Sequence, residues 1–131
     1  MLNHVMVGSN DIERAQRFYD AVLGVLGAGE PMRNVANSGH VRLFYRHNGS
    51  TFGVSEPING EPATAGNGST IGFKCDSPEQ VKAFHDAAVE AGGTSIEDPP
   101  GPREAGALGK MHLSYVRDPD GHKLCAIHRE A

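Results

Sequence analysis

The sequence is short of tryptophan, cysteine and long apolar stretches, and each shortage narrows what the protein can be. It contains no tryptophan and two cysteines, Cys75 and Cys125, which lack the CxxC spacing of a zinc site. No apolar stretch reaches the roughly 18 residues that a membrane span needs, and no signal-peptide core opens the chain. A disulfide is not expected in a reducing compartment. We therefore predict a cytoplasmic protein with no membrane partner.

Positive charge is also scarce. The 12 Lys and Arg residues are outnumbered by 16 Asp and Glu, which gives a net charge of −4 and disfavours nucleic acid as a partner. A hydrophobic content of 38% with 21% charged residues fits one globular domain over residues 1–131. The 17 glycines and 8 prolines indicate many turns, and hence many short strands.

The first half of the chain predicts a strand, a helix and a hairpin. Residues 2–7 are typical of a strand, and Ser9 or Asn10 can cap a helix that Gly24 ends. Apolar residues recur along this helix at three- and four-residue spacing: Ile12, Ala15, Phe18, Tyr19, Val22 and Leu23. Asn48-Gly49 is a strong hairpin signal between apolar segments at 41–45 and 51–55.

The pattern restarts after a Gly- and Pro-rich linker at 58–68. Residues 69–75 predict a strand, Ser77-Pro78 opens a helix, and Gly92-Gly93 ends it. A short strand at 94–96 and a mobile loop at 99–110 follow. Asp118 to Gly121 then forms the turn of a closing hairpin between strands at 113–116 and 124–127.

The two halves are a repeat. A shift of 66 carries Glu13 onto Glu79 and Phe18 onto Phe84, and a shift of 72 carries His40 onto His112. The unit is strand–helix–three strands, present once in module 1 (about 1–57) and once in module 2 (about 69–131).

This doubled unit resembles the vicinal oxygen chelate superfamily, the group of glyoxalases, bleomycin-resistance proteins and extradiol dioxygenases. The motifs that carry the resemblance are the Leu-Asn-His-Val strand at 2–5, the Phe-Tyr-Asp-Ala helix segment at 18–21 and the hairpin at 115–121. The resemblance implies an α+β fold of two tandem βαβββ modules, a cup-shaped open barrel around a small-molecule pocket, and a homodimer. In metal-using members the ion is held by the first and last strand of each module.

Carried onto this sequence, the resemblance places His4, Gly53, Thr70 and Cys125 at the four ligand positions. Only His4 is an ordinary ligand for Zn, Ni, Mn or Fe. A catalytic metal usually keeps three protein ligands. The resemblance allows a divalent metal, but this donor set favours none.

Three residues are candidates for chemistry: His4, His112 and Cys125. His112 could act as general acid or base, or be a partly exposed strand histidine. Cys125 could be a nucleophile if a neighbour such as His4 stabilised its thiolate, or a small buried residue.

Five residues are candidates for ligand binding, each with a structural alternative. Tyr115 could orient a ligand or fill the core. Arg42 could clamp an anion or be solvated. His40, Thr70 and Arg103 complete the set, with Arg103 on the predicted loop. His85, His122 and His128 are expected to face solvent.

Two functions remain open. The first is an enzyme with a degenerate metal site, resembling a lactoylglutathione lyase, another lyase or isomerase, or a dioxygenase. The second is a non-catalytic protein that binds or sequesters a drug or metabolite.

Overall fold

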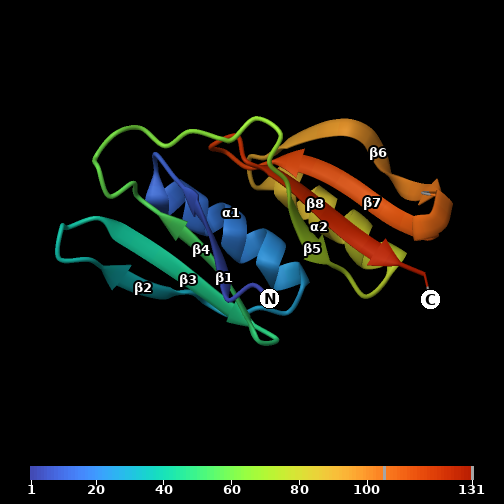
Figure 1. The fold of residues 1–131 in the computed structure, drawn as a ribbon, viewed down its shortest axis with the longest axis horizontal. Coiled ribbons are helices and arrows are strands. Elements are labelled where there is room, and N and C mark those ends of the chain that lie inside the picture. Colours follow the sequence, from blue (N-terminus) through green and yellow to red (C-terminus); the bar gives the residue numbers. More distant parts are fainter. Residues whose placement is uncertain (105, 131) are drawn as a thin grey trace.

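The fold is described from a computed structural model that covers residues 1–104 and 106–130. Ala105 and Ala131, which fall in the predicted loop and at the end of the predicted second module, lie outside the described residues. Figure 1 shows two similar halves side by side, joined by the linker that runs along one edge of the molecule. Each half contains one α-helix and one four-stranded sheet.

The first module is a mixed sheet with one covering helix. Its elements are β1 (His4–Gly8), α1 (Ile12–Val25), β2 (Met32–Val35), β3 (Val41–His47) and β4 (Ser50–Ser55). The strand order is β1-β4-β3-β2, with β1 and β4 parallel and the other pairs antiparallel. The hairpin at Asn48-Gly49 is confirmed, and both of these residues have the positive φ that such a turn requires.

The second module repeats this arrangement. Its elements are β5 (Ile71–Lys74), α2 (Pro78–Glu90), β6 (Thr94–Glu104), the short 3-10 helix η1 (Gly106–Leu108), β7 (Lys110–Arg117) and β8 (Lys123–Arg129). The strand order is β5-β8-β7-β6, again with one parallel pair, β5 and β8. The predicted α+β fold of two βαβββ modules is therefore confirmed.

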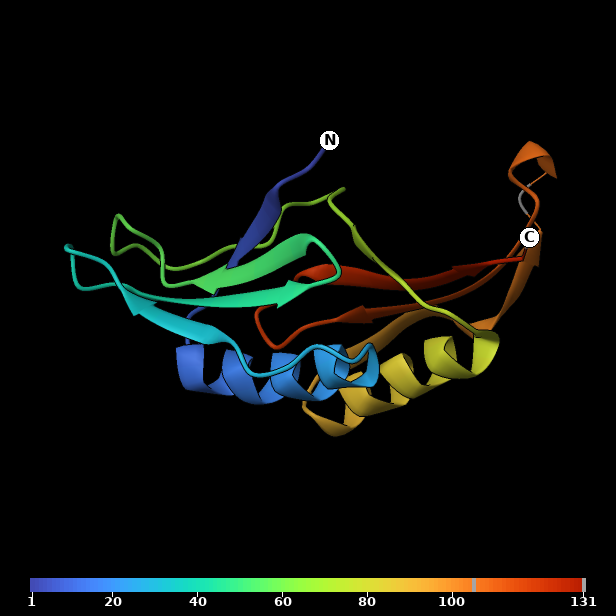
Figure 2. The ribbon, with the colours of Figure 1, turned by 90° about the horizontal axis from the view of Figure 1, so that it is seen from below.

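Both helices cover the same side of the two sheets. Figure 2 shows α1 and α2 in one layer, with both sheets above them. A line of aromatic contacts runs through this interior from one module to the other: Phe18, Tyr19, Phe52, Phe73 and Phe84, with neighbouring ring centroids 4.7–5.5 Å apart. One hydrophobic core thus serves both modules. In the described part of the chain, no helix is long and apolar enough to cross a membrane.

The ends of α1 differ from the prediction. Asp11, and not Ser9 or Asn10, is the N-cap, because its carboxylate accepts the backbone N–H of Arg14 at 3.0 Å. The helix also continues through Gly24 to Val25. It ends where Gly27 takes a positive φ of 96° and donates its N–H to the Gly24 carbonyl. The Ser77 cap of α2 is confirmed.

The predicted loop at 99–110 is wrong over most of its length. Strand β6 continues to Glu104, after an irregularity in its pairing with β7 between Ile96 and Gly101. The prolines of this segment suggested a loop, but they lie on the outer strand of the sheet, where a missing N–H costs no ladder bond.

Polar contacts join the two modules where the turn between β7 and β8 meets α1 and the last residue of β1. The turn after β7 carries Asp118, which accepts the hydroxyl of Tyr19 from α1 at 2.5 Å. In the same turn, Asp120 accepts the Arg14 guanidinium at 3.0 Å. The ring of His122 donates to the Gly8 carbonyl at 2.7 Å, so this histidine does not face solvent as predicted.

Candidate functional site

The face of the two sheets turned away from the helices, called the open face below, carries the positions that the resemblance marks for metal ligands. Side chains alternate along a strand, and Leu43, Tyr45, Phe52 and Val54 point into the core. Their neighbours therefore point to the open face. Strand register aligns them in rows across β1, β4 and β3. One row holds His4, Thr51 and Arg46, and the next holds Met6, Gly53 and Phe44.

Met6 occupies the space beside Gly53. A Cβ atom built on Gly53 would overlap the Met6 sulfur and lie 2.9 Å from its Cε. A ligand side chain at position 53 would thus have to displace Met6. His4 itself is exposed, and its Nδ1 lies 2.9 Å from the Asn3 Oδ1.

The corresponding row of module 2 has the opposite arrangement. There the edge strand carries Gly72 and the inner strand carries Cys125, beside Tyr115. Cys125 is 6% exposed and packs with Met111 and Leu113. Burial raises the pKa of its thiol, while the hydrogen bond with Tyr115 acts in the opposite direction. This thiol is therefore neutral at pH 7 and is a poor metal ligand or nucleophile.

These residues do not fit a catalytic metal. The four positions supply one exposed imidazole, one neutral thiol, one glycine and Thr70, which is exposed just before β5. Among the residues that the structure describes, no three His, Cys, Asp or Glu side chains are grouped to hold an ion. No step of a reaction can be assigned to a metal on this donor set.

A cavity of about 480 Å³ lies at the seam between the modules, next to His4. Its walls come from the inner edge strands β1 and β5, the end of β3 with its turn, the end of α1 and the start of α2. Figure 1 shows β1 and β5 facing each other at the centre of the molecule. The apolar part of the lining includes Leu23, Leu26, Phe52, Ile71 and Phe73, and the polar part includes His4, His47, Thr51, Lys74, Asp76 and Gln80. This volume and mixed lining are typical of a small-molecule site.

The other sequence candidates are dispersed. His40 lines a separate, more open hollow of about 430 Å³ and hydrogen-bonds Ser38. The Arg42 guanidinium is held by Asn34 and lies 5.6 Å from the Phe44 ring centroid. The Arg103 guanidinium donates to the carbonyls of Pro99 and Pro102 on its own strand, and it does not line the cavity.

His112 and Tyr115 lie on opposite faces of β7. His112 shares the helix side with Ser114, and its Nε2 lies 3.2 Å from Glu130. Tyr115 is on the open face, where the Lys123 ammonium lies 4.8 Å from its ring centroid. The structure thus brings Tyr115 and Cys125 together, and it separates both His112 and His40 from His4.

Sequence reasoning missed most residues that line the cavity. Leu23 was recognised only as a core residue, and His47, Lys74 and Gln80 were not singled out. One signal was available: Lys74 is a charged residue at the end of an otherwise apolar strand, at a position that alternation places away from the core.

Paired βαβββ modules, with both helices on one side of the sheets and a cavity at the seam between the modules, define the class of protein. The family model of the Glyoxalase/Bleomycin resistance protein/Dioxygenase superfamily matches residues 1–126. The chain belongs to this superfamily.

Solved structures agree with this assignment. The crystal structure of a glyoxalase/bleomycin resistance protein from Albidiferax ferrireducens T118 is 56% identical, with a TM-score of 0.90 over 98% of this chain and 99% of that one. A glyoxalase-related enzyme from Fulvimarina pelagi is 22% identical, with a TM-score of 0.71 over 98% of this chain and 88% of that one. A V278E glyoxalase I mutant from Zea mays is 19% identical, with a TM-score of 0.70 over 97% of this chain and 45% of that one. The last two share the fold alone. A search of the curated proteins finds no match.

Proposed function

We propose that this protein binds a small organic molecule in the seam cavity without a resident metal ion. The observation that carries the proposal is the difference between the surroundings of two β1 residues, Met6 and His4. On the open face, Met6 fills the place of a ligand side chain at Gly53, while His4 one row away borders a cavity of about 480 Å³. The metal position is closed, and the organic-ligand position is open.

A second function, a metal-independent enzyme of the lyase or isomerase kind, is favoured by one observation. His4 is exposed at the rim of the cavity, and imidazole is the side chain that most often serves as general acid or base near neutral pH. Dioxygenase or lactoylglutathione lyase chemistry has no such support, because in metal-using members it depends on the ion.

We also infer that the protein is a homodimer in the cytoplasm. Large apolar side chains are exposed on β2, with Met32 at 51% and Val35 at 63%, which is typical of a contact surface. Cys75 and Cys125 are unpaired and buried, as in a reducing compartment. Light scattering behind size-exclusion chromatography measures the mass directly, and a monomer of 13.9 kDa at micromolar concentration would contradict the dimer.

Binding is tested with N-phenyl-1-naphthylamine, an uncharged probe that fluoresces in apolar surroundings. The chain has no tryptophan, so its own emission is weak. Ala28 is half-buried and lines the cavity. We expect the wild type to bind the probe and Ala28→Trp to weaken binding by about tenfold or more, because the indole fills the site.

The matched control is Ala107→Trp, which adds the same ring at an exposed position of η1 that does not line the cavity and should leave binding unchanged. Ser50→Trp at the rim provides a second blocking variant if Ala28→Trp folds poorly. The proposal is contradicted if the wild type does not bind the probe. It is also contradicted if both blocking variants bind the probe as tightly as the wild type does. Turnover of a bound candidate that is lost in His4→Ala would favour the enzyme.

A further inference from the structure

The sheets carry the positive charge of this acidic protein. Strands β1, β3, β4, β5, β7 and β8 contain no Asp or Glu at all. The Lys and Arg residues of these strands are Arg42, Arg46, Lys74, Lys110, Arg117, Lys123 and Arg129. The acidic residues, which give the chain its net charge of −4, lie instead on the helices, the turns and the outer strand β6. These strands thus concentrate cationic side chains in a chain whose net charge is negative.

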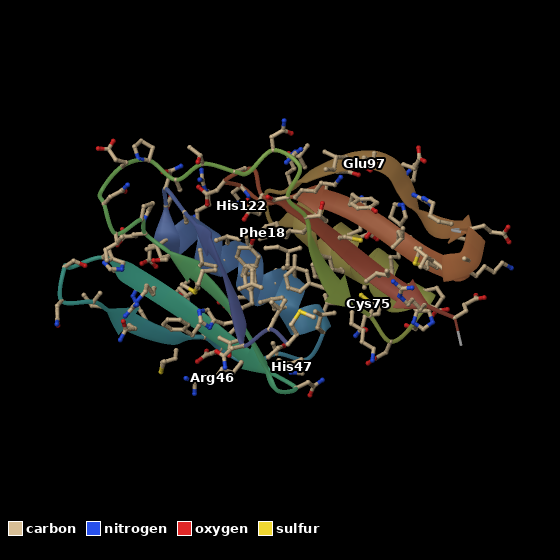
Figure 3. The ribbon with its side chains drawn as sticks, viewed as in Figure 1. Phe18, Arg46, His47, Cys75, Glu97 and His122 are labelled. Carbon is tan, nitrogen blue, oxygen red and sulfur yellow. The ribbon has the colours of Figure 1, made fainter. Side chains whose placement is uncertain are left out.

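Two of these cations lie beside the seam cavity and are not neutralised. Lys74 lines the cavity from β5. Thr51 on β4 also lines the cavity. Its neighbours on the adjacent strands are His4 on β1 and Arg46 on β3. Within residues 1–104 and 106–130, neither Arg46 nor Lys74 forms an ion pair or a side-chain hydrogen bond, whereas Arg42 is bound to Asn34 and Lys123 to Glu97. Figure 3 shows Arg46 and His47 at the same end of the first sheet.

The interior of the cavity is apolar. Leu23, Leu26, Phe52, Ile71 and Phe73 form its inner wall. The one carboxylate of the lining, Asp76, comes just before α2, where its backbone N–H is bound to the Gln80 side chain at 2.7 Å. The cavity thus combines an apolar interior with a polar rim that holds Lys74, Asp76 and the His4 imidazole, and Arg46 lies next to the rim as the strand partner of Thr51.

We infer that the ligand is an amphipathic organic anion. Its ring or chain lies against the apolar wall, and its carboxylate or phosphate lies at the rim. Lys74 and Arg46 supply the charge there, and Thr51 and His4 can donate further hydrogen bonds. This inference rests on the proposed function, since it names the class of molecule that the same cavity takes.

The test is displacement of the uncharged probe by ligands of one shape and different charge. 1-Naphthoate and 1-naphthamide share the ring and differ in charge, and 1-naphthyl phosphate distinguishes a phosphate from a carboxylate. We expect the better of the two anions to displace the probe at concentrations about tenfold lower than the amide. The advantage should shrink as NaCl rises from about 20 to about 300 mM, because salt screens exposed charges.

Charge variants assign the effect to the rim. Lys74→Gln and Arg46→Gln should each weaken the preferred anion about three- to tenfold and leave the amide and the probe unchanged. The control is Arg17→Gln, which removes the same charge from exposed α1 on the helix side and should change nothing.

The two proposals fail in different ways. If the probe binds but naphthoate, the phosphate and naphthamide compete equally, the inference is overturned and the proposed function stands. If Lys74→Gln and Arg46→Gln bind the anions as the wild type does, the anion preference does not come from this rim and the inference is equally overturned. If the probe does not bind at all, the proposed function itself fails.

Discussion

The Met6 side chain lies over the Cα atom of Gly53, where a side chain at position 53 would begin. The two residues are paired in register on β1 and β4, and both face away from the helices. In module 2 the equivalent row places the glycine, Gly72, on the edge strand and Cys125 on the inner strand. The glycine of this row is thus on the inner strand in module 1 and on the edge strand in module 2. In neither module does the row hold two side chains that could bind a metal ion.

This contact predicts strong coupling between the two positions. Gly53→Ala should lower the free energy of unfolding by about 1–2 kcal/mol, because the new methyl group forces Met6 out of its place. In a Met6→Ala background the same change should be neutral or slightly stabilising, since the space is then free and alanine restricts the unfolded chain. Urea denaturation of the four proteins in the cycle measures the coupling. Additive effects would show that Met6 does not hold this position.

The buried hydrogen bond from Tyr19 to Asp118 predicts an asymmetry between two tyrosines. Asp118 is 5% exposed and also accepts the N–H groups of Asp120 and His122. Tyr19→Phe should destabilise the fold by about 2 kcal/mol, because a buried carboxylate loses a donor. Tyr45→Phe is the matched control, since its partner Asp20 is exposed and water can replace the hydroxyl. A cost of about 0.5–1 kcal/mol is expected there. Equal costs would contradict the role assigned to the Asp118 turn.

Alkaline pH should weaken the fold through Cys75. Burial raises the pKa of this thiol from 9.0 to about 11, so the unfolded chain releases a proton that the folded chain keeps. A raised folded pKa gives stability that is complete below pH 9 and is lost as pH rises toward 11. We expect a loss of about 2–3 kcal/mol across that interval and a shallower slope in Cys75→Ala. Urea midpoints at fixed pH measure it, and parallel slopes for the two proteins would refute it.

Most of the fold follows from local signals in the sequence. The period of the apolar residues defined α1 and α2, and Asn48-Gly49 and Asp118 to Gly121 defined both hairpins. The repeat then fixed the order of elements. The segments that were wrongly predicted or not located depend on tertiary context. Strand β6 holds prolines that only an outer strand tolerates, and β2 has four residues, too few for a clear pattern.

The candidate site was less accessible to sequence reasoning. His4 was found because one motif marks it, but a cavity between modules depends on how their edges meet. Leu23 and Phe73 look like ordinary core residues until the seam is seen. His112 lies on the helix side of β7, the side of Ser114, which donates to the Val81 carbonyl. Its predicted catalytic role remains a prediction.

Thiol reactivity tests the candidate role of Cys125. Burial raises the pKa of Cys125 and of Cys75, so neither is a thiolate at pH 7. Reaction with Ellman's reagent should be at least about a hundredfold slower in the native protein than in urea. Cys125→Ser should retain ligand binding. A fast reaction of one native thiol, lost in Cys125→Ser but not in Cys75→Ala, would restore Cys125 as a nucleophile.

Metal content tests the proposal that the protein has no resident metal ion. Protein purified without a metal-affinity tag should contain less than about 0.1 equivalent of Zn, Ni, Mn or Fe, since only His4 is an ordinary ligand at the expected positions. Any ion that binds the folded state must raise the melting temperature, so added metals should shift it by less than about 1 °C. His4→Ala is the matched variant, and it should behave as the wild type in both measurements. Near one equivalent of metal per chain, abolished by His4→Ala, would mean that a partner subunit or a movement of Met6 completes the site. Lyase and dioxygenase activity would then have to be measured on the metal-loaded protein.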